Sequence, residues 1–426
     1  MKYSSLEELS QDMEKNIITN CDQCGDCVTA CSFFSISPLK EMDPVDVTRK
    51  MFAVLQDGTF SDEAYLKAFS CTLCEKCVEV CPQELNPMDF HQSVRNRLVE
   101  SGKSLPGGLS FTLPQKKPYL PEILNSIQMK PSEARWLKEA PPTPEKKEVV
   151  VFLGCAALAT PDKNFAFIDI LEKMGIDFVA LIGGKLCCGI LNFFAGELKE
   201  ADATARNLIK NIESYSPDKL IVTCPMCYNQ LKNVFPHFLS FDFEVQLLPM
   251  FLSDNLDRIK FTTPLNKKVT FHEPCHLSRG IKDDQSARRV IEALPGVELV
   301  EMEHNKEESL CCGGMATTTY PKYGFKFTKV LLEEGKKTNA DCMINICSKC
   351  HISLCSFKEK YPYELTDIPS LVNEAMGGRR YEDKYKKYWE YKDLDKIIEE
   401  AKEYIEASDF SLEEMKKIIP LMFQLS

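Results

Sequence analysis

The sequence predicts an α/β protein in which an N-terminal α-helical domain precedes two repeated open α/β units. Two observations support this prediction. The 20 cysteines fall into one group before residue 82 and another after residue 154, with a proline-rich stretch between them. In the later group the main motifs recur about 120 residues further along the chain, as in a duplicated unit. We therefore expect a domain at residues 1–102, a linker at 103–148, a first unit at 149–260, a second unit at 261–375 and a helical appendage at 376–426.

Composition and charge exclude several classes of protein. The chain has 426 residues and is 44% hydrophobic and 27% charged, which is typical of a globular protein. Its 63 acidic and 52 basic residues give a net charge of −11, which argues against general nucleic-acid binding. No apolar run approaches the ~20 residues that span a membrane, and we recognise no signal peptide. We therefore expect a cytoplasmic protein whose many cysteines are metal ligands, because the cytosol keeps ordinary thiols reduced.

In the first group of cysteines, the spacing that is typical of a bacterial ferredoxin occurs twice. The two runs are Cys21, Cys24, Cys27 and Cys31, then Cys71, Cys74, Cys77 and Cys81 followed by proline. In this spacing three close thiolates bind one cubane [4Fe-4S] cluster and the fourth binds the other cluster. We expect two cubanes with crossed ligands: Cys21, Cys24, Cys27 and Cys81 for the first, and Cys71, Cys74, Cys77 and Cys31 for the second. Zinc is the weaker alternative, because it takes ligands in pairs or fours.

Helices and a linker surround these runs. Asp43-Pro44 is a typical helix start, and an apolar stripe follows it as far as Gly58. A second stripe, beginning at Phe90, ends before Gly102. Residues 103–148 hold eight of the 24 prolines, so we expect a linker wrapped over a surface.

The later segment alternates strand and helix patterns. Short apolar runs at 149–153, 178–182 and 220–223 are typical of buried parallel strands, and helical patterns separate them. This order predicts an open α/β sheet in each unit. Ligands of such sheets bind beyond the carboxyl ends of the strands. We therefore expect the cysteines that follow these strands to meet at one edge.

Each unit carries five such cysteines, two of them adjacent. The first set is Cys155, Cys187, Cys188, Cys224 and Cys227, and the second is Cys275, Cys311, Cys312, Cys347 and Cys350. A thioredoxin-like dithiol would explain Cys224 and Cys227 but not the adjacent pair. A four-coordinate zinc site has too few positions for five thiolates. A multi-iron cluster is the better interpretation.

In this pattern the chain resembles the CCG-domain iron–sulfur proteins. It is similar to the C and B subunits of heterodisulfide reductase fused in one chain, as in the D subunit of that family and the related K subunit of the sulfite-reduction complex. The resemblance implies that each complete set holds a noncubane [4Fe-4S] cluster and that the two clusters face a disulfide between them. Both sets are complete here, whereas electron-transfer relatives often have one set altered, so the resemblance favours catalysis.

The implied activity is reduction or oxidation of a small thiol/disulfide substrate, with electrons carried through the cubanes to the noncubane clusters. Two clusters suit this reaction, because a disulfide takes two electrons and each cluster delivers one. The alternative is a non-catalytic subunit that joins a flavin dehydrogenase to a membrane cytochrome b or quinone pool. In both cases the partners are subunits of a redox complex, which could hold the protein at the inner face of the membrane.

Several residues beside the ligands are candidates for supporting roles. His276 and His351 each follow a ligand and are our candidates for proton delivery, with hydrogen bonding to cluster sulfur as the alternative. We expect His272 to be a core residue or an outer neighbour of the cluster. The glycines of the cofactor-binding turns are expected to allow close backbone approach to the cluster. They are Gly189, Gly313 and Gly314.

Three features remain outside these sites. Cys342 and Cys355 fit neither five-cysteine set, and we expect both to be buried structural thiols. The basic, aromatic stretch that begins at Arg379 is typical of a solvated helix face. Ser411 and Glu414 form a capping box that predicts a last short helix in a docking appendage.

Overall fold

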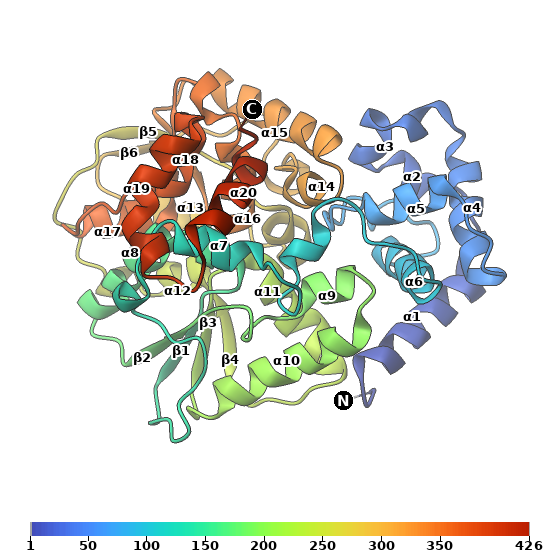
Figure 1. Cartoon of the computed structure of the whole chain (residues 1–426), viewed down its shortest axis with the longest axis horizontal. Coiled ribbons are helices and arrows are strands. Elements are labelled where there is room, and N and C mark those ends of the chain that lie inside the picture. Colours follow the sequence, from blue (N-terminus) through green and yellow to red (C-terminus); the bar gives the residue numbers. More distant parts are fainter. Residues whose placement is uncertain (1, 426) are drawn as a thin grey trace.

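The computed structural model describes residues 2–425 and confirms the predicted fold class. A helical N-terminal domain packs beside two separate parallel sheets of four strands each (Figure 1). In that view the blue helices of the N-terminal domain form one side of the molecule. Within the described residues no helix is both long and apolar enough to span a membrane.

The N-terminal domain is built from six helices around short cysteine loops. The helices are α1 (Leu6–Asn20), α2 (Asp26–Thr29), α3 (Ser32–Ile36), α4 (Pro44–Gln56), α5 (Asp62–Phe69) and α6 (Pro87–Glu100). The two predicted helices are confirmed as α4 and α6, and the Asp43 carboxylate accepts a hydrogen bond from the Val45 amide at 2.8 Å. Their apolar faces share one core with α1 and α5, which leaves the cysteine loops at the helix ends.

The proline-rich segment is built into the core in its first part and runs over the surface in much of its second part, after residue 130. It contains 3-10 helices at Leu109–Thr112 and Pro131–Glu133 and helix α7 (Leu120–Ser126). Tyr119 and Ile127 are almost fully buried. The Leu137 amide donates to the Ala180 carbonyl, so the segment also extends the edge of the first sheet. The prolines interrupt regular structure here without preventing burial.

The first unit is a parallel sheet with strand order β2-β1-β3-β4. Its strands are β1 (Val149–Phe152), β2 (Phe178–Leu181), β3 (Lys219–Val222) and β4 (Glu244–Leu247). Its helices are α8 (Pro161–Lys173), α9 (Ile190–Phe194), α10 (Leu198–Glu213), α11 (Pro225–Asn229) and α12 (Leu248–Asp254). All of β1 is buried, in agreement with its continuous apolar sequence.

The second unit repeats this topology with order β6-β5-β7-β8. Its strands are β5 (Lys267–Phe271), β6 (Val297–Leu299), β7 (Cys342–Asn345) and β8 (Glu364–Asp367). Its helices are α13 (Ser286–Ala293), α14 (Gly314–Thr319), α15 (Pro321–Lys337), α16 (Ser348–Cys355) and α17 (Ile368–Ala375).

The two units pack against each other reciprocally. Helix α8 of the first unit contacts α17 of the second, and α13 of the second contacts α12 of the first. Because α8 corresponds to α13 and α12 to α17, each unit gives the same pair of helices to the interface. One continuous core of buried residues therefore runs between the two sheets.

The C-terminal appendage consists of α18 (Lys384–Tyr391), α19 (Leu394–Glu406) and α20 (Leu412–Phe423). The predicted capping box is confirmed at the start of α20. The buried Tyr388 hydroxyl donates to the Ile127 carbonyl at 2.8 Å, and Phe423 packs against Tyr385 and Trp389. The first contact fixes the appendage to the linker, and α18 also contacts α16 of the second unit.

Candidate metal centres

The structure brings four thiols of the N-terminal domain to one cavity. The cysteines lining it are Cys21, Cys24, Cys27 and Cys81, the first of the two crossed sets. Gly25 has a φ of 86° between two of them, and an added Cβ would meet the Val45 amide at 2.8 Å. The tight loop therefore depends on this glycine.

The second crossed set is also assembled. Burial raises the pKa of the Cys77 thiol, and the neighbouring Cys71, Cys74 and Cys31 raise it further because like charges repel. The fourth thiol of each set thus comes from the other run. Four sulfurs per site fit the donor set of a cubane.

In the first unit the five cysteines converge beyond the carboxyl ends of β1, β2 and β3. The Sγ atoms of Cys155 and Cys187 lie 3.7 Å apart, and those of Cys188 and Cys227 lie 3.3 Å apart. Hydrogen bonds with Cys187 and Cys227 lower the pKa of Cys188 to about 6. The site therefore favours a thiolate, which is the metal-binding form of cysteine.

The second unit builds the equivalent site beyond β5 and β7. A hydrogen bond with Cys311 and another with Cys350 lower the pKa of Cys312 well below its usual range. The Gly314 amide donates to the Cys312 sulfur at 3.4 Å. Burial raises the pKa of Cys275, the first cysteine of this set. The negative charge of the nearby Cys312 thiolate raises the pKa of Cys275 further.

The two five-cysteine sets meet. The Cys224 thiol of the first set lies close enough to Cys347 of the second set to lower the pKa of Cys347. These two residues occupy equivalent positions in the repeat. The second unit also contacts the second ferredoxin run, because the Arg279 Nε donates to the Cys74 carbonyl at 2.6 Å.

Gly189 and Gly313 follow the adjacent cysteine pairs and have φ angles of 75° and 80°. A Cβ on Gly189 would lie 2.7 Å from the Ala201 carbonyl oxygen of α10, and one on Gly313 would overlap the Gly324 carbonyl of α15. In the structure these glycines allow the cysteine turn to pack tightly on a helix backbone. Of the three glycines, Gly314 is the one at which an added Cβ would lie near a cysteine sulfur, 3.4 Å from the Cys312 Sγ.

We expect Gly189→Ala to reduce the stability of the first unit by at least about 3 kcal/mol, since left-handed strain and a backbone clash add together. Gly175→Ala is the matched control, because Gly175 has a φ of 68° but open space around it. It should cost only about 1–2 kcal/mol of strain. The measurement is anaerobic thermal unfolding, and equal losses in both variants would contradict the packing role.

The three histidines near the second set have different surroundings. His351 points away toward the appendage: its Nε2 lies 2.7 Å from Asp383 Oδ2 and its Nδ1 lies 3.3 Å from Asn345 Nδ2. His276 Nδ1 lies 3.4 Å from Glu75 Oε1, and its buried Nε2 has no protein partner. Among the three, His351 therefore has both ring nitrogens occupied by other side chains.

His272 is the histidine that faces the second set. One ring nitrogen lies within 4.8 Å of the Cys312 and Cys350 sulfurs, the residue is 1% exposed, and neither nitrogen has a nitrogen or oxygen partner. Phe152 occupies the equivalent position in the first unit. The sequence predicts a core residue or an outer neighbour of the cluster at His272. A comparison of the repeats would distinguish it further, since an imidazole replaces an apolar ring at the carboxyl end of a buried strand.

Two further residues near the sulfurs were not singled out by the sequence. The buried Tyr119 hydroxyl from the linker lies near Cys155 and has no hydrogen-bond partner in the described residues. Lys349, between two ligands of the second set, is near Cys312 and Cys155, and its Nζ donates to Thr318 Oγ1 at 2.6 Å. Cys342 and Cys355 are buried outside both five-cysteine sets.

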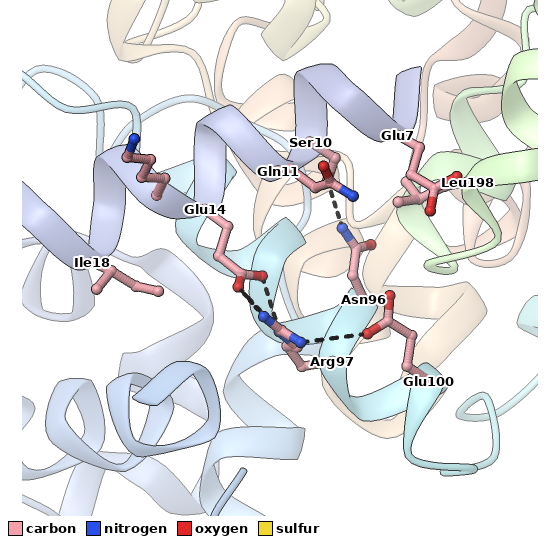
Figure 2. A pocket seen from close by; sticks show the side chains of 10 residues that line it. Glu7, Ser10, Gln11, Glu14, Ile18, Asn96, Arg97, Glu100 and Leu198 are labelled. Carbon is pink, nitrogen blue, oxygen red and sulfur yellow. Dashed lines mark hydrogen bonds and ion pairs between the residues drawn. The ribbon is translucent and has the colours of Figure 1, made fainter. Parts of the chain in front are cut away.

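A separate pocket between α1 and α6 contains none of these cysteines (Figure 2). Its polar residues join the two helices instead. The Arg97 Nε donates to Glu14 Oε1 at 3.0 Å, and the Asn96 amide donates to the Ser10 hydroxyl at 2.8 Å. We assign this pocket a packing role.

Comparison with known proteins agrees with the cysteine geometry. The cysteine-rich CCG domain matches residues 149–232 and again 269–355, and the 4Fe-4S dicluster domain matches residues 20–86. The chain contains a 4Fe-4S dicluster domain and two CCG domains, and it resembles the D subunit of heterodisulfide reductase. The two CCG matches coincide with the two five-cysteine sets.

Several curated proteins match this chain over most of their own length. The D subunit of dihydromethanophenazine:CoB–CoM heterodisulfide reductase from Methanosarcina barkeri is 27% identical over 84% of this chain and 93% of its own. The Methanosarcina acetivorans protein of the same name is 28% identical over 84% and 94%. The B subunit of fumarate reductase (CoM/CoB) from Methanothermobacter marburgensis is 26% identical over 82% of this chain and 70% of its own. The CCG-domain protein is thus an iron–sulfur subunit of heterodisulfide-reductase type with a role in electron transfer.

Proposed function

We propose that this protein carries electrons through two cubane [4Fe-4S] clusters to two noncubane [4Fe-4S] clusters, where a thiol/disulfide substrate is reduced or oxidised. The observation that supports catalysis most directly is that both five-cysteine sets are complete and meet at Cys224 and Cys347. Two electron carriers beside each other suit a two-electron bond cleavage. The proposed ligands are the eight cysteines of the two ferredoxin runs and the ten cysteines of the two five-cysteine sets.

The contacts between domains support an order for the clusters. The second cubane loop lies against the second unit, because Cys74 accepts a hydrogen bond from Arg279 and its thiol is near Cys275. The Asn229 amide of the first unit also reaches Glu75 Oε1 at 3.2 Å. The order that follows is first cubane, second cubane, second five-cysteine set, first five-cysteine set.

When bound, the noncubane clusters would supply one electron each to a disulfide, which leaves two thiolates and consumes two electrons. The chain provides groups for the substrate side of this step. The Lys349 ammonium lies near sulfurs of both sets and forms no ion pair with any residue in 2–425, so it can balance a nascent thiolate. A hydrogen bond from His272 would hold a sulfur of the second set, and one from Tyr119 would hold a sulfur of the first set.

A cavity of about 340 Å³ opens beside Lys349 and supports a place for the organic part of the substrate. Its walls are largely apolar and come from the linker, the second unit and the appendage, including Phe111, Phe325 and Trp389. Its volume lies within the range of small-molecule sites.

The first test is iron and acid-labile sulfide analysis of protein purified without air. Four four-iron clusters require about 16 iron atoms per chain. We expect a value close to that number, with sulfide in equal amount. A content below about half of it would contradict the proposal and favour a structural zinc protein, which zinc analysis of the same sample would reveal.

A pure electron-transfer subunit is the second candidate, and one comparison favours it. EtfAB:quinone oxidoreductase of Syntrophomonas wolfei is 28% identical over 58% of this chain and 36% of its own. In that role the partners would be a flavin protein and a membrane cytochrome b or quinone pool. A paramagnetic state that forms only when thiol is present would exclude this role.

A further inference from the structure

We propose that Lys67 and Arg95 hold the second cubane at a higher reduction potential than the first, so that electrons move inward from the first cubane to the second. The inference rests on the cubane ligands given under the proposed function. It adds a direction to electron transfer between the two cubanes. Each step moves one electron: the outer cubane is oxidised and the inner one is reduced. A one-electron donor protein outside this chain supplies the electron.

Lys67 is placed beside the second crossed set by helix α5, which ends two residues before Cys71. The residue is 1% exposed and forms no ion pair with any carboxylate in residues 2–425. Its ammonium is within hydrogen-bonding reach of Cys31 and also close to Cys71. Burial raises the pKa of Cys31, but the Lys67 ammonium outweighs burial and the net shift is downward.

Arg95 approaches the same set from helix α6 and is fully buried. Its Nη1 donates to the Ala68 carbonyl at 2.9 Å and its Nη2 to Gln92 Oε1 at 2.6 Å, which fix the guanidinium. The Nε has no nitrogen or oxygen partner, and the guanidinium lies beside Cys71. Two buried cations therefore lie beside this set. One largely buried carboxylate, Glu75, belongs to the same cysteine loop, but its Oε1 faces the second and first units, 3.4 Å from His276 Nδ1 and 3.2 Å from the Asn229 amide nitrogen.

The first crossed set has the opposite surroundings. No lysine or arginine is among the residues that line its cavity, whereas Asp22 is. The charges of Asp22 and Asp26 raise the pKa of Cys24 further after burial has raised it. Lys67 also acts on Cys27, but only by its charge, whereas its ammonium lies closer to Cys31.

This asymmetry acts on the potentials because reduction adds one negative charge to a cluster. A nearby buried cation stabilises the reduced form, and a nearby carboxylate destabilises it. The two cations lie in a water-excluded core, where charges interact strongly, while Asp22 and Asp26 beside the first set are exposed and screened. We expect each buried cation to favour reduction of the second cubane by roughly 10- to 100-fold.

Redox titration followed by electron paramagnetic resonance tests the proposal. The Cys24→Ala variant removes a proposed ligand of the first cubane and so identifies the signal of the second. In wild-type protein that remaining signal should belong to the cubane of higher potential. If it belongs to the lower-potential cubane, the proposal is overturned; if both cubanes persist in Cys24→Ala, the ligand assignment fails instead.

Lys67→Gln should lower the midpoint of the second cubane by at least the 59 mV that corresponds to a tenfold change, and shift the first by less. Lys67→Arg keeps the positive charge and should leave the midpoint of the second cubane near its wild-type value. Lys50→Gln is the control, because Lys50 pairs with Glu63 at the surface of the same domain. Equal shifts of both cubanes, or no shift, would overturn the proposal.

A variant that does not depend on the buried site covers the case in which Lys67→Gln fails to fold. Asp22→Asn can keep the hydrogen bond that the Cys24 amide donates to this side chain. It should raise the midpoint of the first cubane and narrow the gap between the two. An unchanged or wider gap would overturn the proposal.

Discussion

We expect Cys312→Ser to abolish the thiol-dependent paramagnetic signal. It should also lower the iron content by about four atoms per chain, if the second five-cysteine set holds a four-iron cluster. The expected loss is this large because Cys312 is a buried thiol whose hydrogen bonds with Cys311 and Cys350 favour the thiolate. Both cubanes should remain, because their ligands belong to another domain. The measurement is electron paramagnetic resonance after oxidation with and without thiol, together with iron analysis.

Cys355→Ser is the matched control for this experiment. Cys355 lies in α16, as Cys350 does, and is also buried, but it belongs to neither five-cysteine set. Its replacement should leave the iron content and the signal unchanged. A signal in Cys312→Ser that is unaffected, or a signal in wild-type protein that is indifferent to thiol, would favour the electron-transfer role.

Cys74→Ala is expected to stop reduction of the noncubane clusters by a physiological donor while sparing their reduction by a small chemical reductant. The reason is positional: the backbone of Cys74 contacts Arg279 of the second unit, and its thiol is near Cys275. Loss of a cluster at this junction removes the electron-transfer step from the ferredoxin domain to the second unit. Stopped-flow reduction with each reductant measures the effect.

The small reductant serves as the internal control, since it reaches the noncubane clusters without the relay. Raised salt should slow the donor reaction if charge steers docking on this acidic protein. Unchanged turnover of Cys74→Ala with the physiological donor would show that electrons bypass the ferredoxin domain, and the order of clusters proposed above would be wrong.

The parts of the fold that local sequence determines could be predicted. Helix α4 follows from its cap and stripe, and the convergence of cysteines in each unit follows from strand ends that share one edge. The crossed ferredoxin sets follow from spacing alone, and their ligand roles stay a prediction. In each case the deciding interaction lies within a few residues or within a known topology.

Other features depend on packing between distant segments and could not be predicted. The sequence does not show that the linker brings Tyr119 to Cys155, or that Cys224 and Cys347 meet. It also does not show that the Asp383 carboxylate turns His351 toward the appendage, since these residues are 32 positions apart. Among the histidines, position in the chain next to a ligand was a poorer guide to proximity to the sulfurs than position at the carboxyl end of a buried strand, where His272 lies.

The reciprocal packing of α8 on α17 and of α13 on α12 gives the pair of units an approximate twofold axis. In an isologous dimer the same patch of each subunit contacts its copy, and this interface has that form within one chain. In a homodimer of one such unit the two sulfur sites would have to be identical. Because both units lie in one chain, equivalent positions can differ, as phenylalanine at position 152 and histidine at position 272 do, and the two sites can have different surroundings.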